Sequence, residues 1–363
     1  MKRGFQGPAA ERTFGIAAAV SMVVSIAACG GADKAPAAAA APPAAPQKAP
    51  PAAAAPKTPA PTAAAEKKPP ATAARDQGAT AEEVARQARG DLACPPKIAT
   101  PARAEKAPVD DVLGVRPGMT YEEAMNLALC VHPLLVATPA GGRGFNLKVP
   151  QGMTLRQGFA VREAEPRVVK TSKQIMKEMQ DDAIARGGNA VRENLKPGQT
   201  RWFVGTMGLP GQERVLSVAR EERYAADQSP TVDNLTAALL QKYGKPTRNQ
   251  RGTSGQLPFV VWAYDALGRP VTETSPLYNK CTGSSDPDGG VHLSPDCGLV
   301  VQAMLVPHRT NPELVERLQV GVVDQAGGYR LITATEQALG QAEQQRRAQE
   351  VERAAKNTKA PKL

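Results

Sequence analysis

The residues with the most distinctive chemistry in this 363-residue chain are its five cysteines. A thiol can carry a lipid, bind a metal, act as a nucleophile or pair in a disulfide. The first of them, Cys29, lies far from the others along the chain. The other four cysteines can all pair in two disulfides: Cys94, Cys130, Cys281 and Cys297.

Metal and catalytic chemistry fit the sequence less well than disulfides do. No two cysteines have the CxxC spacing, and His132, His292 and His308 are not spaced as zinc ligands. The sequence also contains no GxSxG, HExxH or Walker phosphate-loop motif. We therefore predict no catalytic residue, no metal site and no cofactor.

Adjacent acidic residues form two pairs, Asp181-Asp182 and Glu221-Glu222. Side chains of neighbouring residues point apart in helices and in strands, so neither pair can hold one substrate. We predict that all four are solvated surface charges. A further acidic stretch at 286–290 lacks the ligand spacing of an EF-hand loop and predicts a turn.

The residues before Cys29 have the pattern of an export signal. Positive charges at Lys2, Arg3 and Arg12 precede an uncharged stretch at 14–28 that is too short to span a bilayer. This arrangement is typical of a signal peptide. Export would bring the chain into an oxidising compartment, where the four distal cysteines form disulfides. Three connectivities can join them, and pairing of nearest neighbours closes the shortest loops.

The residues Ile26, Ala27 and Ala28 lead directly into Cys29 and Gly30, and this sequence resembles the bacterial lipobox. In that class the cysteine receives diacylglycerol, the preceding peptide is removed and the new amino terminus is acylated. The resemblance implies lipid attachment at Cys29 and stable anchoring, because several acyl chains insert together. Gly30 is not the aspartate that retains enteric lipoproteins in the inner membrane, which implies the periplasmic face of the outer membrane. The alternatives are a plain signal peptide with an incidental cysteine and an uncleaved helix.

Alanine and proline dominate the segment from about 32 to 79. Such a composition offers little apolar surface to bury, and proline favours extended conformations. We predict a disordered, semi-rigid tether. The net charge of +10 comes mainly from the flanking segments, and aromatic residues make up only 4% of the chain. This distribution favours an anionic membrane surface or wall polymer and excludes a nucleic-acid reader.

Two helices are predicted from their end signals. Thr120 with Glu123 forms a capping box, and the helix that follows would end near Cys130. A later helix would begin at Thr231 and stop at Gly244.

The segment 172–186 predicts another amphipathic helix, and two glycines follow it as a stop signal. Its apolar residues recur at helical spacing, so we expect them to face the core: Ile175, Met176, Met179 and Ala183.

Several later runs predict β-strands. Residues 202–209 and 213–224 are separated by a Pro-Gly turn and indicate a hairpin. The runs 259–265, 299–306 and 318–324 are rich in β-branched and aromatic residues. We predict an α+β fold in which helices pack on an antiparallel sheet. Because the order of a helix followed by strands occurs twice, we expect two related modules or one composite domain.

The starts and ends of two helices resemble a known family. Gly118, Met119 and Thr120, followed by Glu123, look like the G-M-T/S-x-x-E opening in small outer-membrane lipoproteins of the SmpA/OmlA (BamE) kind. The stretch 242–246 (KYGKP) is similar to the KYGxP transition in that group and in β-lactamase-inhibitor-like modules. Both folds place a helical hairpin against an antiparallel sheet and bind proteins, so the resemblance implies a protein-binding role.

The predicted order of segments is a lipoprotein signal peptide (1–28), a disordered tether (29–79), a short helix with a connector (80–109), a first α+β module (110–228), a second (229–330) and an exposed helical tail with a disordered end (331–363). We predict a non-catalytic protein-binding or structural role in the bacterial cell envelope, with an envelope protein as partner. The alternative is an envelope hydrolase or other enzyme that acts on cell wall or polysaccharide through a site with no recognisable motif. A deep pocket lined by acids or histidines would favour the hydrolase, and an exposed apolar surface would favour binding.

Overall fold

The computed structural model describes residues 78–140, 144–168, 170–185, 195–252 and 257–357. The expected signal peptide, Cys29 and the tether up to residue 77 therefore lie outside the described residues, as do the glycine stop at 187–188 and residues 358–363. We expect disorder over 356–363, but residues 356 and 357 are the last two of a helix. In the described part of the chain, no helix is both long enough and apolar enough to cross a membrane.

The described ranges contain five helices and eight strands. The helices are α1 (Ala81–Arg89), α2 (Tyr121–Leu129), α3 (Ser172–Ala185), α4 (Val232–Tyr243) and α5 (Gln325–Asn357). The strands are β1 (Leu135–Pro139), β2 (Gly158–Glu163), β3 (Thr200–Met207), β4 (Arg214–Arg223), β5 (Arg248–Gln250), β6 (Phe259–Asp265), β7 (Cys297–Pro307) and β8 (Val315–Asp324).

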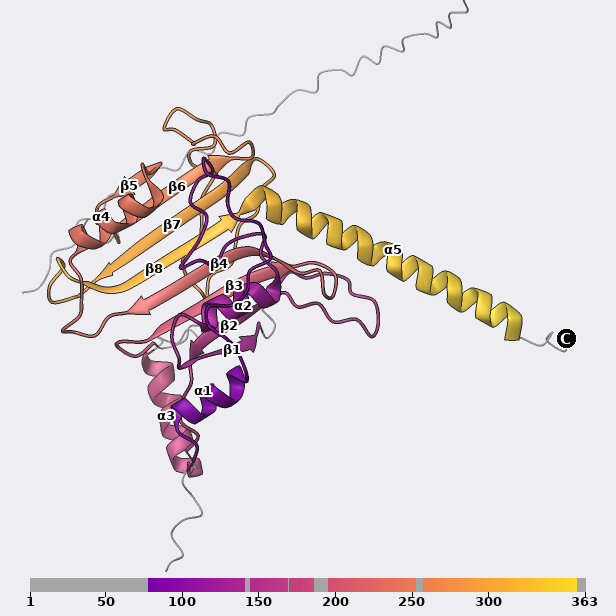
Figure 1. The fold of residues 1–363 in the computed structure, drawn as a ribbon, viewed down its shortest axis with the longest axis horizontal. Coiled ribbons are helices and arrows are strands. Elements are labelled where there is room, and N and C mark those ends of the chain that lie inside the picture. Colours follow the sequence, from indigo (N-terminus) through magenta and orange to yellow (C-terminus); the bar gives the residue numbers. More distant parts are fainter. Residues whose placement is uncertain (1–77, 141–143, 169, 186–194, 253–256, 358–363) are drawn as a thin grey trace, which may run out of the picture. The chain divides into compact units, whose positions relative to one another are not determined.

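All eight strands form one antiparallel sheet in the order β1-β2-β3-β4-β8-β7-β6-β5 (Figure 1). The first four strands fill one half of the sheet and the last four fill the other. The halves meet where β4 pairs with β8, with Arg220 opposite Val320. The predicted α+β class is confirmed, and its two helix-then-strands halves share a continuous sheet.

From each edge of the sheet to its middle, the strands follow in chain order, β1 to β4 from one edge and β5 to β8 from the other. In each half a threonine caps the helix that precedes the four strands, Thr120 for α2 and Thr231 for α4. Each threonine also forms an isolated bridge beside the inner strand of its half, Thr120 to Arg214 and Thr231 to Leu314.

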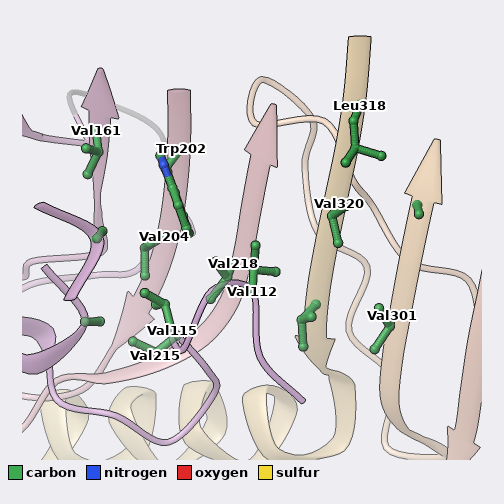
Figure 2. Close-up of a cluster of buried hydrophobic side chains, with 14 of the residues drawn as sticks. Val112, Val115, Val161, Trp202, Val204, Val215, Val218, Val301, Leu318 and Val320 are labelled. Carbon is green, nitrogen blue, oxygen red and sulfur yellow. The ribbon is translucent and has the colours of Figure 1, made fainter. Parts of the chain in front are cut away.

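The larger hydrophobic core lies between the sheet and the helices α2 and α4. Side chains alternate between the faces of a strand, so Val260 and Trp262 of β6 enter this core while Val261 and Ala263 enter a smaller core on the opposite face. Figure 2 shows the larger core, where side chains from neighbouring strands gather beside the segment 112–115. The labelled residues include Val115, Val161, Trp202, Val204, Val218, Val301 and Val320.

The capping signals in the sequence form as predicted. The amide of Glu123 donates to Oγ1 of Thr120 at 3.2 Å, and the amide of Thr120 donates to Oε2 of Glu123 at 3.0 Å. Thr231 caps α4, which ends at Gly244. The Trp262 indole donates to the Gly244 carbonyl at 2.8 Å, which fastens the end of α4 to the sheet. Local signals therefore fix both helices that cover the larger core.

The C-terminal helix differs from the prediction. It begins at Gln325, directly after β8, and not at 331, and its first part is packed against the protein, with Ala326 and Leu339 buried. The two glycines at 327 and 328 weaken the local helical signal. Gly328 is nevertheless part of the helix. Its backbone lies so close to Leu216 and Leu293 that a larger side chain at this position would crowd those two residues. Only the later turns are the exposed tail that the sequence predicts.

Candidate functional site

Two disulfides fasten loops to the sheet and its helices. Cys94 is bonded to Cys130, the C-cap of α2, and Cys281 is bonded to Cys297, the first residue of β7. These are the pairs that close the two shortest loops. Within the described ranges, no group of three or more His, Cys, Asp or Glu residues could hold a metal ion.

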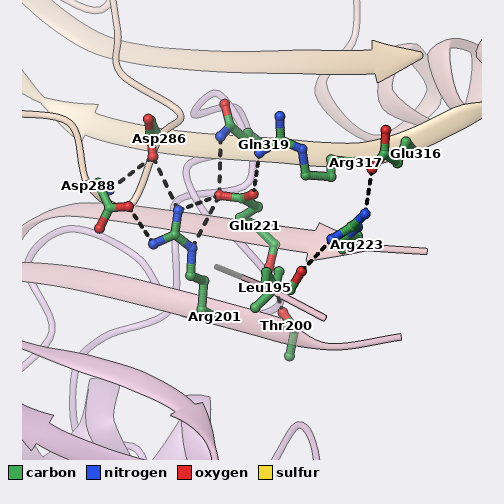
Figure 3. Close-up of polar contacts among 10 residues, drawn as sticks. All are labelled: Leu195, Thr200, Arg201, Glu221, Arg223, Asp286, Asp288, Glu316, Arg317 and Gln319. Carbon is green, nitrogen blue, oxygen red and sulfur yellow. Dashed lines mark hydrogen bonds and ion pairs between the residues drawn. The ribbon is translucent and has the colours of Figure 1, made fainter. Parts of the chain in front are cut away.

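A charged cluster is buried on the face of the sheet opposite α2 and α4 (Figure 3). Nη2 of Arg201 on β3 lies 2.7 Å from Oε2 of Glu221 on β4, and these side chains are only 3% and 1% exposed. Arg201 also donates from Nη1 to Asp288 at 2.5 Å. Glu221 accepts further hydrogen bonds from Arg317 at 3.0 Å and from Gln319 at 3.2 Å. Every member of the cluster therefore binds another.

The cluster keeps its central residues ionised. Burial by itself would raise the pKa of Glu221, but Arg201, Arg317 and the Gln319 amide hold that pKa below its usual range. Burial by itself would lower the pKa of Arg201, but Glu221 and Asp288 outweigh burial and raise that pKa above its usual value. A general acid or base needs a pKa near the working pH, and both shifts move away from neutrality. The ion pairs and hydrogen bonds of the cluster therefore connect β3, β4, β8 and the loop at 281–297.

The prediction that Glu221 is a solvated surface charge is wrong. Its neighbour Glu222 does point away from it, as alternation requires, and is 32% exposed. Glu221 lies on the opposite face, where the disulfide-closed loop covers it and contributes Asp288. The turn expected at 286–290 is present, since Gly289 donates to the Asp286 carbonyl at 2.9 Å. Sequence spacing alone does not show that this turn lies against β3.

One serine and one histidine lie within hydrogen-bond distance of each other, with Oγ of Ser229 2.7 Å from Nε2 of His308. A nucleophilic serine also needs a third group that orients the base. In the described ranges no carboxylate is hydrogen-bonded to the His308 ring, and Ser229 donates to the Ala225 carbonyl at 3.2 Å. The histidine amide binds the Leu314 carbonyl at 2.9 Å. The pair thus fastens the β7–β8 turn to the segment before α4.

Helix α3 presents the apolar surface that the sequence assigned to the core. The prediction of a helix is correct, but the prediction that its apolar residues face inward is wrong. Ile175, Met176 and Met179 are 46%, 67% and 61% exposed, and Ala183 is exposed as well. The reason is topological, because α3 lies in the connection between β2 and β3, while α2 and α4 already cover the larger core. We call these four residues the α3 stripe.

Local contacts hold α3 in its helical form. Thr171 and Gln174 form a capping box, with the Thr171 amide 2.9 Å from Oε1 of Gln174. Lys170 is paired with Glu178 at 2.6 Å. A 14-residue helix without tertiary packing is marginal in water, because most helical stability in proteins comes from burying an apolar face. Covering the α3 stripe would therefore stabilise the helix itself.

Comparison with known proteins gives no match, whether with protein-family models, curated proteins or solved structures.

Proposed function

We propose that this protein is a non-catalytic lipoprotein of the bacterial cell envelope, anchored through a lipid on Cys29, that binds another envelope protein through the α3 stripe. The observation that carries the proposal is the exposure of Ile175, Met176 and Met179 on one side of a capped helix. Contiguous exposed apolar residues are uncommon on monomeric proteins and mark interaction sites.

The chemistry of α3 favours a protein groove as its partner. Methionine side chains are flexible and polarisable, so they adapt to irregular apolar surfaces. Apolar residues at i, i+1, i+4 and i+8 form the face that an amphipathic helix lays into a groove. Helices that bind anionic membranes carry many Lys or Arg residues on their polar face. In α3, two lysines are outnumbered by three acids, Glu178, Asp181 and Asp182.

The rest of the fold suits a rigid platform for such a helix. The sheet is continuous across both halves, the disulfides close its loops, and the buried cluster around Arg201 and Glu221 locks its central strands. A tether between the lipid and the platform would let the platform reach a partner away from the membrane.

Site-specific photocrosslinking in intact cells tests the binding surface. A photoreactive residue at Met179 is expected to give one discrete crosslinked product. The same residue at Lys177, on the side of α3 away from the α3 stripe, is expected to give none. The substitution Met176→Glu should remove the Met179 product, because a carboxylate cannot enter an apolar groove without a large desolvation cost.

A stability measurement separates docking from internal packing. Because Met176 is exposed, Met176→Glu should change the free energy of unfolding by less than about 0.5 kcal/mol. Equal crosslinking from positions 177 and 179, or strong destabilisation by Met176→Glu, would show that the α3 stripe is not a docking surface.

The lipid anchor has its own test. Cells fed with labelled palmitate should incorporate the label into the protein, and Cys29→Ser should abolish incorporation and release the protein from the membrane fraction. A Cys29→Ser protein that fractionates and migrates like the original would contradict the anchor and leave the α3 result unaffected.

A further inference from the structure

The two disulfides differ in how accessible they are to solvent. Cys94 is exposed and Cys130 is half-buried. Cys281 and Cys297 are both 0% exposed and lie in the smaller core. Thiol–disulfide exchange requires a thiolate to approach a sulfur atom directly, so access decides which bond can react in the folded protein. The Cys94–Cys130 bond meets this requirement and the Cys281–Cys297 bond does not.

An arginine lies beside the exposed disulfide. Nη2 of Arg89, the last residue of α1, is 3.6 Å from Sγ of Cys94. Nη1 of the same side chain donates to the His132 carbonyl at 2.9 Å, which holds the guanidinium in place. A neighbouring cation stabilises a thiolate. Arg89 therefore makes Cys94 a good leaving group.

The position of Cys130 has the opposite effect. Cys130 is the C-cap of α2, and the carbonyl end of a helix carries a partial negative charge that disfavours a thiolate. In thiol–disulfide exchange, the entering thiolate bonds to one sulfur and the other sulfur leaves as a thiolate. The two local charges therefore direct the entering thiolate to Sγ of Cys130, with Cys94 as the leaving group.

The segment 90–101, which we call the connector, is attached near both ends of α2. Near the start of α2, the amide of Thr100 donates to Oε1 of Glu123 at 2.8 Å. At the other end, Cys94 is bonded covalently to Cys130. Helix α2 is itself fixed in the larger core by Ala124 and Ala128. Opening the disulfide would therefore release the connector at one end and leave α2 in place.

We propose that Cys94–Cys130 is a thiol–disulfide exchange site for a protein dithiol of the CxxC type, and that its reduction frees the connector from the C-terminal end of α2. One thiolate of the dithiol attacks Sγ of Cys130, the S–S bond breaks, and Cys94 leaves as a thiolate and takes up a proton. The second thiolate of the dithiol attacks the dithiol's own sulfur in the mixed disulfide, and Cys130 leaves and is protonated. Two electrons thus pass to this protein, and the dithiol departs as a disulfide.

None of the residues in this site belongs to the α3 stripe, so the inference does not depend on the proposed function.

Selective reduction of the folded protein is the first test, with reduced thioredoxin, a general CxxC dithiol, as the probe. The full-length protein is incubated with the probe, new thiols are blocked with N-ethylmaleimide, and the alkylated cysteines are located by mass spectrometry. We expect Cys94 and Cys130 to be alkylated at least about tenfold faster than Cys281 and Cys297. Equal rates for the two pairs, or alkylation of Cys94 and Cys130 before the probe is added, would overturn the proposal.

Unfolding provides the control for that measurement. In urea both disulfides are accessible, so dithiothreitol should reduce the two pairs at similar rates. A difference that persists in urea would show that the folded structure does not cause the selectivity, and it would count against the proposal.

A trapping experiment tests the direction of attack. A thioredoxin variant with serine in place of its second active-site cysteine cannot complete the exchange, so the mixed disulfide accumulates. Mass spectrometry should find the probe bonded to Cys130. A probe bonded mainly to Cys94 would overturn the proposed direction.

Variants of Arg89 test the effect of its charge. Arg89→Gln should slow the reduction of Cys94–Cys130 by about three- to tenfold, and Arg89→Lys should restore most of the rate because it keeps the charge. Lys280→Gln removes an exposed cation that directly precedes the buried Cys281, and it should leave the rate unchanged. If Arg89 only held the connector in place, Arg89→Gln would expose the sulfurs further and speed reduction. An unchanged or higher rate would therefore contradict the role of Arg89.

Hydrogen exchange tests the release of the connector. After selective reduction, the amides of the connector should exchange faster than in the oxidised protein, while the first two turns of α2 should keep their protection. Connector amides that exchange equally in the two states would show that reduction does not free this segment.

Discussion

Arg201 and Glu221 lie opposite each other on the neighbouring strands β3 and β4, with their charged atoms 2.7 Å apart and both side chains almost fully buried. Removing the charge of Glu221 would leave Arg201 and Arg317 with fewer compensating carboxylates. We expect Glu221→Gln to reduce the free energy of unfolding by about 3 to 5 kcal/mol. Urea denaturation followed by circular dichroism measures this change.

The adjacent residue provides a matched control for that experiment. Glu222 is paired with Arg220 at 2.8 Å on the other face and is 32% exposed. Glu222→Gln should therefore cost less than about 1 kcal/mol. Similar costs at positions 221 and 222 would contradict the role assigned to the buried cluster.

The two disulfides should contribute unequally to stability. The Cys94–Cys130 pair spans 36 residues and the Cys281–Cys297 pair spans 16. On the chain-entropy model these loops stabilise the folded state by about 4 and about 3 kcal/mol. Replacing Cys94 and Cys130 by alanine should lower the melting temperature more than replacing Cys281 and Cys297. Dithiothreitol should lower the melting temperature of the original protein, and an unchanged value would argue against both bonds.

Glu123 should make the protein sensitive to acid. Burial by itself would raise its pKa, but the Thr100 hydroxyl and the amides of Thr120, Thr100 and Ala99 lower the pKa to about 2, from an ordinary value of 4.5. Because the folded-state pKa is the lower one, Glu123 stabilises the fold above pH 4.5. This stabilisation is lost as the pH falls from about 4.5 to about 2.

Glu123→Gln measures that contribution. At pH 7 the variant should be less stable than the original protein by about 1 to 2 kcal/mol, and the difference should shrink towards zero near pH 2. The control is Glu83→Gln in the capping box of α1, where the glutamate is exposed and the cost should be smaller. A difference at position 123 that stays constant with pH would refute the assignment.

The helix α5 should divide into a part that stabilises the fold and a part that does not. Leu339 is 2% exposed, so Leu339→Ala should cost about 2 to 4 kcal/mol. Residues 344–357 are mostly exposed, and their ion pairs, such as Lys356 with Glu352, lie within the helix. Ending the chain after residue 343 should change the free energy of unfolding by less than about 1 kcal/mol. Thermal unfolding of both variants measures the two effects.

Local sequence patterns predict those helices and strands whose caps, or whose strand-forming residues, lie close together in the chain. Thr120 with Glu123 and Thr231 with Gly244 marked α2 and α4 correctly, because a cap depends on side chains within one helical turn. The runs 259–265, 299–306 and 318–324 all lie within strands of the sheet. The sequence patterns do not predict the two edge strands, β1 and β5, or the strand β2. Residues 248–250 (Arg-Asn-Gln) form β5 only because Val261 and its neighbours on β6 offer a partner.

The sequence by itself determined the classes of helix and strand, the caps of α2 and α4 and the even set of distal cysteines, since each depends on residues close together in the chain. Only the tertiary structure decided which apolar and charged residues are buried. Apolar residues have the same helical spacing in a core helix and in an exposed one. The apolar residues of α3 are exposed because α2 and α4 already cover the larger core. Glu221 is buried because a loop that begins 60 residues further along the chain, and is closed by Cys281 and Cys297, lies over it. Burial depends on contacts between distant segments, and no local pattern contains that information.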